Sequence, residues 1–181
     1  WTRARQVYAV AADGSVTITG LQPAGPFDEP ADVVATEVMV TTRDGVKVPM
    51  SIVHKRNVRL DGNNPTLLWG YASYGITEEP WFSVHRLAWL DAGGVFAVAN
   101  PRGSGVFGRE WHLAGQKATK PNTWNDFIAC AEHLIRRKYT SPPHLAITGG
   151  SAGGLLMGAL LKRGQRIALK LVGIDALQVA A

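Results

Sequence analysis

Apolar and polar positions alternate in two segments near the start of the chain, and each segment has an Asp-Gly pair in its middle. Residues 6–21, QVYAVAADGSVTITGL, alternate on both sides of the pair at 13–14, and residues 36–55 do so around the pair at 44–45. Asp-Gly favours the tight turn of a β-hairpin, and alternation is typical of strands with one buried face. The pattern predicts two β-hairpins, joined by a proline- and acid-containing linker at 22–32.

Farther along the chain the alternation gives way to short, continuous apolar runs. They lie at 66–72 (TLLWGYA), 94–100 (GVFAVAN), 144–148 (HLAIT) and 169–174 (LKLVGI). Runs without alternation are typical of strands that are buried on both faces of a parallel sheet. We therefore predict strands at these four positions.

Helical spacing separates these strands. Phe82, Leu87 and Leu90 recur at near-helical intervals before two glycines, which indicates a helix that stops there. A second helix is predicted over 152–161. Because strands and helices alternate, the sequence predicts an α/β protein with a mostly parallel sheet and helices on both faces.

The best-marked helix lies within residues 122–139, NTWNDFIACAEHLIRRKY. One face of it carries an apolar stripe of Trp124, Phe127, Ile128, Ala131, Leu134 and Ile135. We predict Asn122 or Thr123 as its N-cap, since both side chains can accept a hydrogen bond from a free backbone N–H.

Composition and charge narrow the class of protein. Of the 181 residues, 46% are hydrophobic and 18% are charged, as in ordinary globular domains. No apolar run approaches the roughly 20 residues that span a bilayer, so no membrane partner is expected. The formal net charge of +5 comes from scattered basic residues, with one cluster at 136–138 where a helix end favours cations. Without an accompanying recognition motif, this charge predicts no nucleic-acid partner.

The cysteine content and the first residues bear on chemistry and location. A single cysteine, Cys130, excludes an internal disulfide and gives no metal cluster. The start, WTRARQVYAV, has neither an initiator methionine nor the apolar segment of a signal peptide. We expect an internal part of a longer protein, with the cytoplasm favoured as its location.

A glycine-rich turn around one serine carries the candidate chemistry. Residues 149–153, GGSAG, fit the G-x-S-x-G pattern of a nucleophile elbow, with a strand before and a helix after. In such a turn Ser151 points out of the sheet, and glycines let the strand and helix approach closely. The elbow glycines are Gly149, Gly150, Gly153 and Gly154. The backbone N–H of Ala152 would help to stabilise an oxyanion. A glycine-rich loop with an incidental serine is the alternative interpretation.

A competing motif occurs at 103–108, GSGVFG, which fits the G-x-G-x-x-G pattern of a dinucleotide site. That fingerprint needs glycines that open a helix directly and an acidic residue at the end of the next strand. Here the segment 101–122 is predicted to continue as a long irregular loop. Asp126, the acid at about the right distance, falls within a helical stripe. A dinucleotide site is therefore disfavoured.

The ordered motifs resemble the prolyl oligopeptidase family of serine peptidases. The similarity spans about residues 36–161 and includes LLWGYASYGITEEPWF, LAWLDAGGVFAVANPRGSGVFGREWHLAG, KPNTWNDFIACAEHLI, YTSPPHLAIT and GGSAGG. The resemblance implies a partial α/β-hydrolase fold over residues 31–181, incomplete at its C-terminal end. Residues 1–30 would be the end of the β-propeller that precedes this domain in the family.

The resemblance also implies roles for single residues. Ser151 would be the nucleophile, with the backbone N–H of Ala152 and the hydroxyl of Tyr71 as oxyanion donors. Tyr74 matches an aromatic position that lines the substrate. Pro101 stands where prolyl-specific members usually have an aliphatic residue, which leaves the residue specificity open. The segment KRGQRIALK after the last predicted helix also departs from the family pattern.

The base and acid of a catalytic triad are harder to place. An α/β-hydrolase supplies its triad in the order Ser, Asp or Glu, His, yet all five histidines precede Ser151. They are His54, His85, His112, His133 and His144, and each is interpreted as a surface or packing residue. Asp175, the one acid after Ser151, is interpreted as structural, because in this family the catalytic Asp and His come farther downstream. We therefore expect an incomplete chain whose partner is a missing C-terminal segment of the same enzyme.

The leading hypothesis is a serine peptidase that cleaves short peptides through an acyl-enzyme on Ser151. Such an enzyme is expected to need neither a metal nor an organic cofactor. Without a base, its serine is a poor nucleophile at neutral pH, so the 181 residues alone are expected to be inactive. Two alternatives stay open: an esterase-like α/β-hydrolase that acts on non-peptide acyl substrates, and a non-catalytic binding or regulatory remnant.

Overall fold

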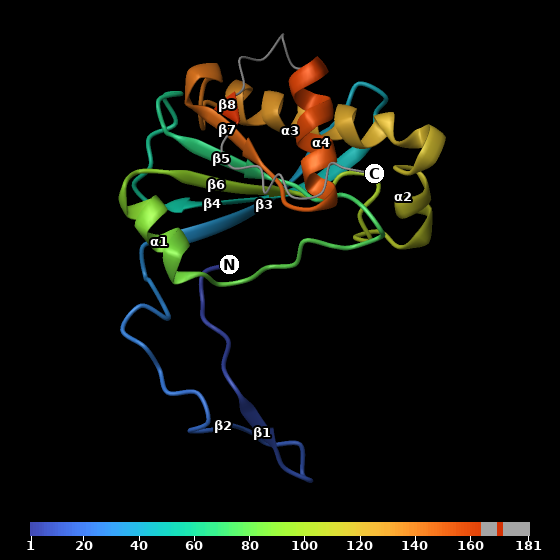
Figure 1. Cartoon of the computed structure of the whole chain (residues 1–181). Coiled ribbons are helices and arrows are strands. Elements are labelled where there is room, and N and C mark those ends of the chain that lie inside the picture. The colour runs from blue at the N-terminus through green and yellow to red at the C-terminus, as the bar shows by residue number, and fades with distance from the viewer. Residues whose placement is uncertain (164–169, 172–181) are drawn as a thin grey trace.

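The computed structural model describes residues 1–163 and 170–171. Within these residues, the body of the protein is a mixed β-sheet with helices on both faces (Figure 1). The strand order is β3-β4-β6-β5-β7-β8. The strands are β3 (Val33–Thr41), β4 (Lys47–Lys55), β5 (Thr66–Trp69), β6 (Val95–Ala99), β7 (Leu145–Thr148) and β8 (Lys170–Leu171). β4 is antiparallel to β3 and to β6, whereas β5 is parallel to β6 and β7, and β7 to β8. The predicted α/β architecture is confirmed.

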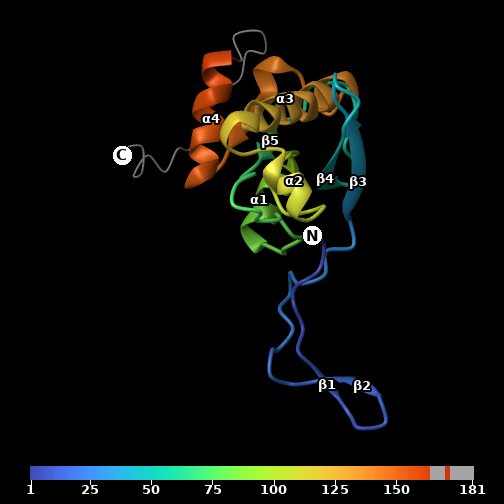
Figure 2. The same ribbon diagram turned by 90° about the vertical axis from the view of Figure 1, so that its right-hand side faces the viewer.

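The helices cover the two faces of the sheet unequally. They are α1 (Val84–Asp91), α2 (Arg109–Leu113), α3 (Pro121–Arg136) and α4 (Ala152–Arg163), with short 3-10 helices η1 (Lys117–Thr119) and η2 (Pro142–His144). α3 and α4 lie over one face and α1 over the other (Figures 1 and 2). Phe127 and Leu156 are fully buried in the cluster that contains Leu68, while Leu90 packs in the opposite cluster with Phe96. Each such buried side chain contributes about 1.5–3 kcal/mol of hydrophobic stabilisation.

Both predicted hairpins form. The second consists of β3 and β4, which are paired from Val33 with Lys55 to Thr41 with Lys47. The first consists of β1 (Tyr8–Val10) and β2 (Val16–Ile18), and it extends away from the sheet (Figures 1 and 2). Its apolar side chains are exposed, with Val10 at 70%. The assignment of residues 1–30 to a propeller stays a prediction.

A backbone hydrogen bond and an exposed ion pair join the two sides of the stem that carries the first hairpin. The backbone N–H of Ala4 donates to the carbonyl oxygen of Asp28 (2.8 Å). Arg3 and Glu29 form an ion pair at 3.5 Å in which both side chains are more than half exposed. Surface pairs of this kind contribute little to stability.

The chain end before this stem is held by an aromatic cluster. The guanidinium of Arg86 lies 5.2 Å from the ring centre of Trp1 and 4.6 Å from those of Trp81 and Phe96. Burial lowers the pKa of Arg86 to about 10. The indole of Trp1 also donates to the carboxylate of Glu37 on β3 (3.2 Å). Cation–π contacts of a desolvated guanidinium therefore fasten Trp1 to the body of the protein.

The start of α3 differs from the prediction. Lys120 is the N-cap and Pro121 the first helical residue, so the expected cap at Asn122 or Thr123 is wrong. Proline suits this position because its ring presets the helical φ and its missing N–H is not needed there. The two polar side chains bind elsewhere: Asn122 donates to the carbonyl of Ala114, and Thr123 to that of Arg102.

Two further expectations concern the loop predicted at 101–122 and the strand predicted at 169–174. The segment 101–122 is not an irregular loop throughout, because it contains α2 and η1. Of the strand predicted at 169–174, only Lys170–Leu171 is described, as β8. No helix among the described residues has the length and hydropathy needed to cross a membrane.

Candidate active site

Ser151 occupies a strained turn between β7 and α4. Its φ is 52°, a left-handed value that residues with a Cβ rarely adopt. The turn closes through hydrogen bonds from the N–H of Gly153 to the carbonyl of Gly150 (2.8 Å) and from that of Gly154 to the carbonyl of Ser151 (2.9 Å). The side chain of Ser151 is exposed. Positive φ at an exposed serine between strand and helix is the geometry that the G-x-S-x-G pattern requires.

Two of the four elbow glycines are required by space. A Cβ on Gly149 would overlap the carbonyl oxygen of Gly70, and a Cβ on Gly153 would lie 2.8 Å from the same oxygen. A Cβ on Gly150 would approach only the Trp69 ring, at 4.0 Å, and one on Gly154 would meet nothing within 4 Å. The expectation of close approach thus holds for 149 and 153 and is wrong for 150 and 154.

The end of β5 brings Tyr71 to the same turn. The N–H of Gly70 donates to the carbonyl of Thr148 (3.1 Å), which joins β5 to the end of β7. A Cβ on Gly153 would lie 3.4 Å from the Cα of Tyr71. The structure therefore places Tyr71 beside the turn that carries Ser151. Ala152, the third predicted site residue, is the first residue of α4.

A cavity of about 370 Å³ lies next to this turn. It is lined by Ser73, Tyr74, His112, Gly115, Gln116, Lys117, Lys120, Ala152 and Leu155. Tyr74 is 75% exposed and has a φ of 57°, so it belongs to a second left-handed backbone segment. Ala152 and Tyr74, two of the site residues predicted from the sequence, thus line the same cavity.

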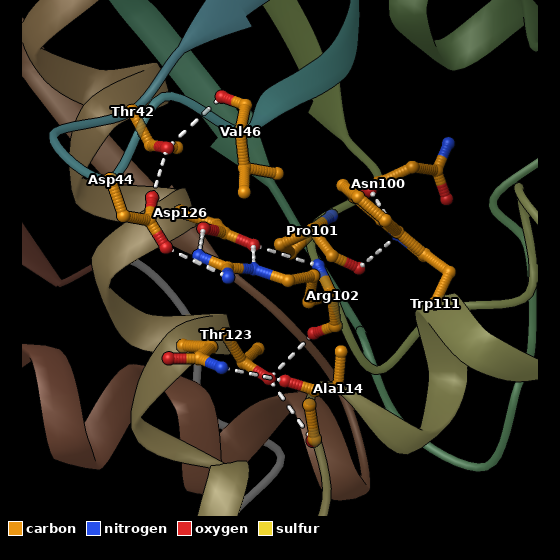
Figure 3. A network of polar contacts seen from close by, with 12 residues as sticks. Thr42, Asp44, Val46, Asn100, Pro101, Arg102, Trp111, Ala114, Thr123 and Asp126 are labelled. Atoms are coloured by element: carbon orange, nitrogen blue, oxygen red, sulfur yellow. Dashed lines mark hydrogen bonds and ion pairs between the residues drawn. The ribbon is translucent and has the colours of Figure 1, made fainter.

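A buried ion-pair network supports the loop beyond β6 (Figure 3). Asp126, fully buried on α3, accepts hydrogen bonds from the backbone N–H (2.9 Å), Nε (2.8 Å) and Nη2 (2.6 Å) of Arg102. Nη1 of Arg102 pairs with Asp44 in the β3–β4 turn (2.9 Å), and the carbonyl of Arg102 accepts from Thr123 (2.6 Å). Asp126 and Asp44 raise the pKa of Arg102 against the opposing effect of its burial. One guanidinium therefore joins three separate segments.

Two of the three glycines of the GSGVFG motif serve loop packing, whereas Gly108 has open space around it and is the N-cap of α2. Gly103 has a φ of 106°, and a Cβ there would lie 2.5 Å from the carbonyl oxygen of Ala72. A Cβ on Gly105 would overlap the carbonyl of Gly75. Asp126 is engaged by Arg102 and is not free to bind a ribose hydroxyl. These contacts agree with the interpretation against a dinucleotide site.

Comparisons with known proteins agree with this geometry. A model of the prolyl oligopeptidase family matches residues 80–168. The prolyl endopeptidase of Elizabethkingia meningoseptica is 45% identical over 132 residues, which are 73% of this chain and 19% of the relative. The solved oligopeptidase B from Trypanosoma brucei superposes with a TM-score of 0.86 at 39% identity, and the match covers 96% of this chain and 24% of that one. The chain belongs to the prolyl oligopeptidase family. It spans about a fifth of the length of the curated relatives that it matches.

Apart from the cavity residue His112, the histidines of this prolyl oligopeptidase-family chain lie on strands or helices elsewhere in the fold. His54 lies on β4, His85 on α1, His133 on α3 and His144 in η2. The ring of His54 lies 5.7 Å from that of Tyr139, and Nδ1 of His144 lies 3.1 Å from the hydroxyl of Ser141. Burial, together with nearby arginines, lowers the pKa of His133. These positions fit the surface or packing roles expected for them.

His112 and Lys120 lie in the cavity wall. The sequence analysis interpreted His112 as a surface or packing residue and did not single out Lys120. Nδ1 of His112 lies 3.0 Å from the carbonyl oxygen of Gly103. Nζ of Lys120 donates to the carbonyl of Ala72 (2.7 Å). The motif spacing contains no signal for these contacts, because the loop after β6 and the start of α3 meet the β5 loop only in the folded chain. Asp175, interpreted as structural, lies outside the described residues.

The two kinds of elbow glycine predict opposite effects on stability. Gly149→Ala should lower the free energy of unfolding by about 1–3 kcal/mol, because its methyl group would overlap the Gly70 carbonyl. Gly154→Ala should raise it by about 0.5–1 kcal/mol, because alanine has the higher helix propensity and the space is open. Urea denaturation of the protein that carries this sequence measures both. Equal effects of the two substitutions would contradict the close approach.

The two carboxylates on Arg102 should differ in energetic importance. Asp126→Asn should destabilise the fold by about 3–5 kcal/mol, since the buried guanidinium of Arg102 loses its buried charged partner and keeps only the exposed Asp44. Asp44→Asn removes a partner whose side chain is 51% exposed, and should cost about 0.2–1 kcal/mol. Thermal and urea unfolding of the matched pair provide the measurement. A cost for Asp44→Asn as large as that for Asp126→Asn would refute this ranking.

Proposed function

We propose that the protein carrying this chain is a serine peptidase that hydrolyses short peptides through an acyl-enzyme on Ser151. The main support is the geometry of one turn: an exposed serine with a φ of 52° between β7 and α4, with the backbone of Tyr71 beside the turn. The curated relatives add support, since their names include prolyl endopeptidase and Protease 2. The serine and its surroundings thus support this reaction class.

In the proposed reaction the Ser151 oxygen attacks the scissile carbonyl carbon and forms a C–O bond. The serine proton passes to a general base and then to the leaving amine as the C–N bond breaks. Water then cleaves the resulting ester and restores the serine. The N–H of Ala152 and the hydroxyl of Tyr71 would donate to the oxyanion in both halves of the reaction, and one such donor is worth about 3–4 kcal/mol.

We further propose that residues 1–30 are the end of a preceding β-propeller and that residues 31–181 are the first part of the peptidase domain. The exposed apolar side chains of the first hairpin support this division, with Val16 at 61% and Ile18 at 62% exposure. Such surfaces usually pack against another element.

A fluorophosphonate probe tests the nucleophile. The protein that carries this sequence should be labelled once, at Ser151, and Ser151→Ala should abolish labelling and peptide hydrolysis. Ser104→Ala, at a buried serine whose hydroxyl contacts Trp111, serves as the matched control and should remain labelled. Labelling that survives Ser151→Ala would refute the proposal. Turnover of simple esters without any turnover of peptide amides would favour the esterase alternative.

Expression of the 181 residues alone provides a second test. We expect no peptide hydrolysis by this chain, because the histidines precede Ser151 and no triad base is assigned among them. The measurement is a peptidase assay of the purified 181-residue chain beside the complete gene product. Hydrolysis by the short chain that disappears in its Ser151→Ala variant would show that one of these histidines acts as the base.

A further inference from the structure

We propose that Lys120 is a positioning residue, which orients the hydroxyl of Tyr71 by holding the backbone that follows it. This inference rests on the proposed role of Ser151 and Tyr71 in acyl transfer. Its basis is a contact between segments far apart in the sequence. Nζ of Lys120, at the N-terminus of α3, donates to the carbonyl oxygen of Ala72 (2.7 Å) and to the hydroxyl of Ser73 (3.1 Å).

The backbone that Lys120 holds is strained. Ala72 has a φ of 52° and Tyr74 a φ of 57°, both left-handed values at residues with a Cβ. Such conformations persist only where the surroundings determine them. Gly75 adds one tie, since its N–H donates to the carbonyl of Gly103 (3.2 Å). The ammonium of Lys120 supplies two further ties to this loop.

Tyr71 is thereby fixed on both sides. Before it, the N–H of Gly70 donates to the carbonyl of Thr148 at the end of β7 (3.1 Å). After it, the carbonyl of Ala72 is held by Lys120. The same carbonyl lies so close to Gly103 that a Cβ there would be 2.5 Å away, which leaves no room for a side-chain donor from residue 103.

The ammonium of Lys120 binds the loop after Tyr71 through hydrogen bonds and not through an ion pair. Its side chain is partly buried, and burial lowers its pKa. Within residues 1–163, no carboxylate forms an ion pair with it. An ammonium has three donors, and two of them bind neutral oxygens of the loop. The cost of partly burying this charge is therefore offset by backbone contacts beside Tyr71.

Loss of this tether should act on the transition state more than on binding. A misplacement of about 1 Å at a catalytic donor can cost about 10²-fold in rate. In the complete protein that carries this sequence, we therefore expect Lys120→Met to lower kcat for hydrolysis of p-nitrophenyl acetate by about 10- to 100-fold, with KM changed by less than about twofold. Lys162→Met, at an exposed lysine near the end of α4, is the control and should behave as the unmodified protein.

A double-mutant cycle with Tyr71→Phe decides whether Lys120 acts through Tyr71. The single Tyr71→Phe change should lower kcat by about 10²–10³-fold. If Lys120 only orients this hydroxyl, adding Lys120→Met to Tyr71→Phe should lower kcat no further. Losses that multiply in the double variant, or a rise in KM with kcat unchanged, would overturn the proposal.

Chemical rescue separates positioning from a structural effect. Lys120→Cys should lose activity, and treatment with 2-bromoethylamine should restore most of it, because the thiolate displaces bromide and forms a C–S bond that carries a new ammonium. Cys130 should not react, since it is fully buried and burial raises the pKa of its thiol. The treated unmodified protein is the control.

The outcomes keep this inference distinct from the proposed function. Turnover that survives Ser151→Ala would contradict the proposed function itself. Turnover that is lost in Ser151→Ala but unchanged in Lys120→Met would overturn the inference alone. Failure of rescue, or unfolding of every Lys120 variant by circular dichroism, would give Lys120 a structural role and would also overturn it.

Discussion

The position of Ser151 depends on the close approach of two backbone segments. The carbonyl oxygen of Gly70 occupies the space that a Cβ on Gly149 or Gly153 would need. Because β5 and β7 are parallel neighbours, both strands end at the same edge of the sheet. The contact at Gly70 therefore brings the turn of Ser151 and the loop of Tyr71 together without any side chain between them.

Polar contacts at buried positions give the surrounding loops their shape. Arg102 and Asp126 are both nearly inaccessible to water, and a pair of this kind gains little net stability compared with apolar residues of similar volume. The more important effect of the pair is on geometry, because its hydrogen bonds fix the relative positions of the segments that it connects. The guanidinium of Arg102 binds α3 and the β3–β4 turn at once, while its carbonyl accepts from Thr123. Gly103, the next residue, then lies against the carbonyl of Ala72 in the loop beside the site.

The sequence was sufficient for much of the fold because its signals are local. Alternation around Asp-Gly predicted the β3–β4 hairpin, and continuous apolar runs predicted β5, β6 and β7. The stripe through Phe127 and Leu134 predicted the buried face of α3. Local signals failed where a side chain had a distant partner: Thr123 was expected to cap α3, but its hydroxyl donates to Arg102 in another loop.

The candidate site was predictable only in part, for the same reason. The G-x-S-x-G pattern identified the turn of Ser151, but it could not tell which glycines face a neighbouring backbone. That distinction needs the position of Gly70, about 80 residues earlier in the chain. His112 and Lys120 also could not be assigned to the cavity from spacing, because their segments meet the loop after β5 only in the folded chain.

The stem below the β1–β2 hairpin has a mechanical consequence. One hydrogen bond between Ala4 and Asp28 and one exposed ion pair between Arg3 and Glu29 join its two sides, while Trp1 and Val33 are fastened to the body of the protein. The exposed ion pair adds little to the stability of the stem. A neighbouring surface that covers the apolar side chains of the hairpin would therefore change the orientation of the hairpin relative to the sheet at small energetic cost.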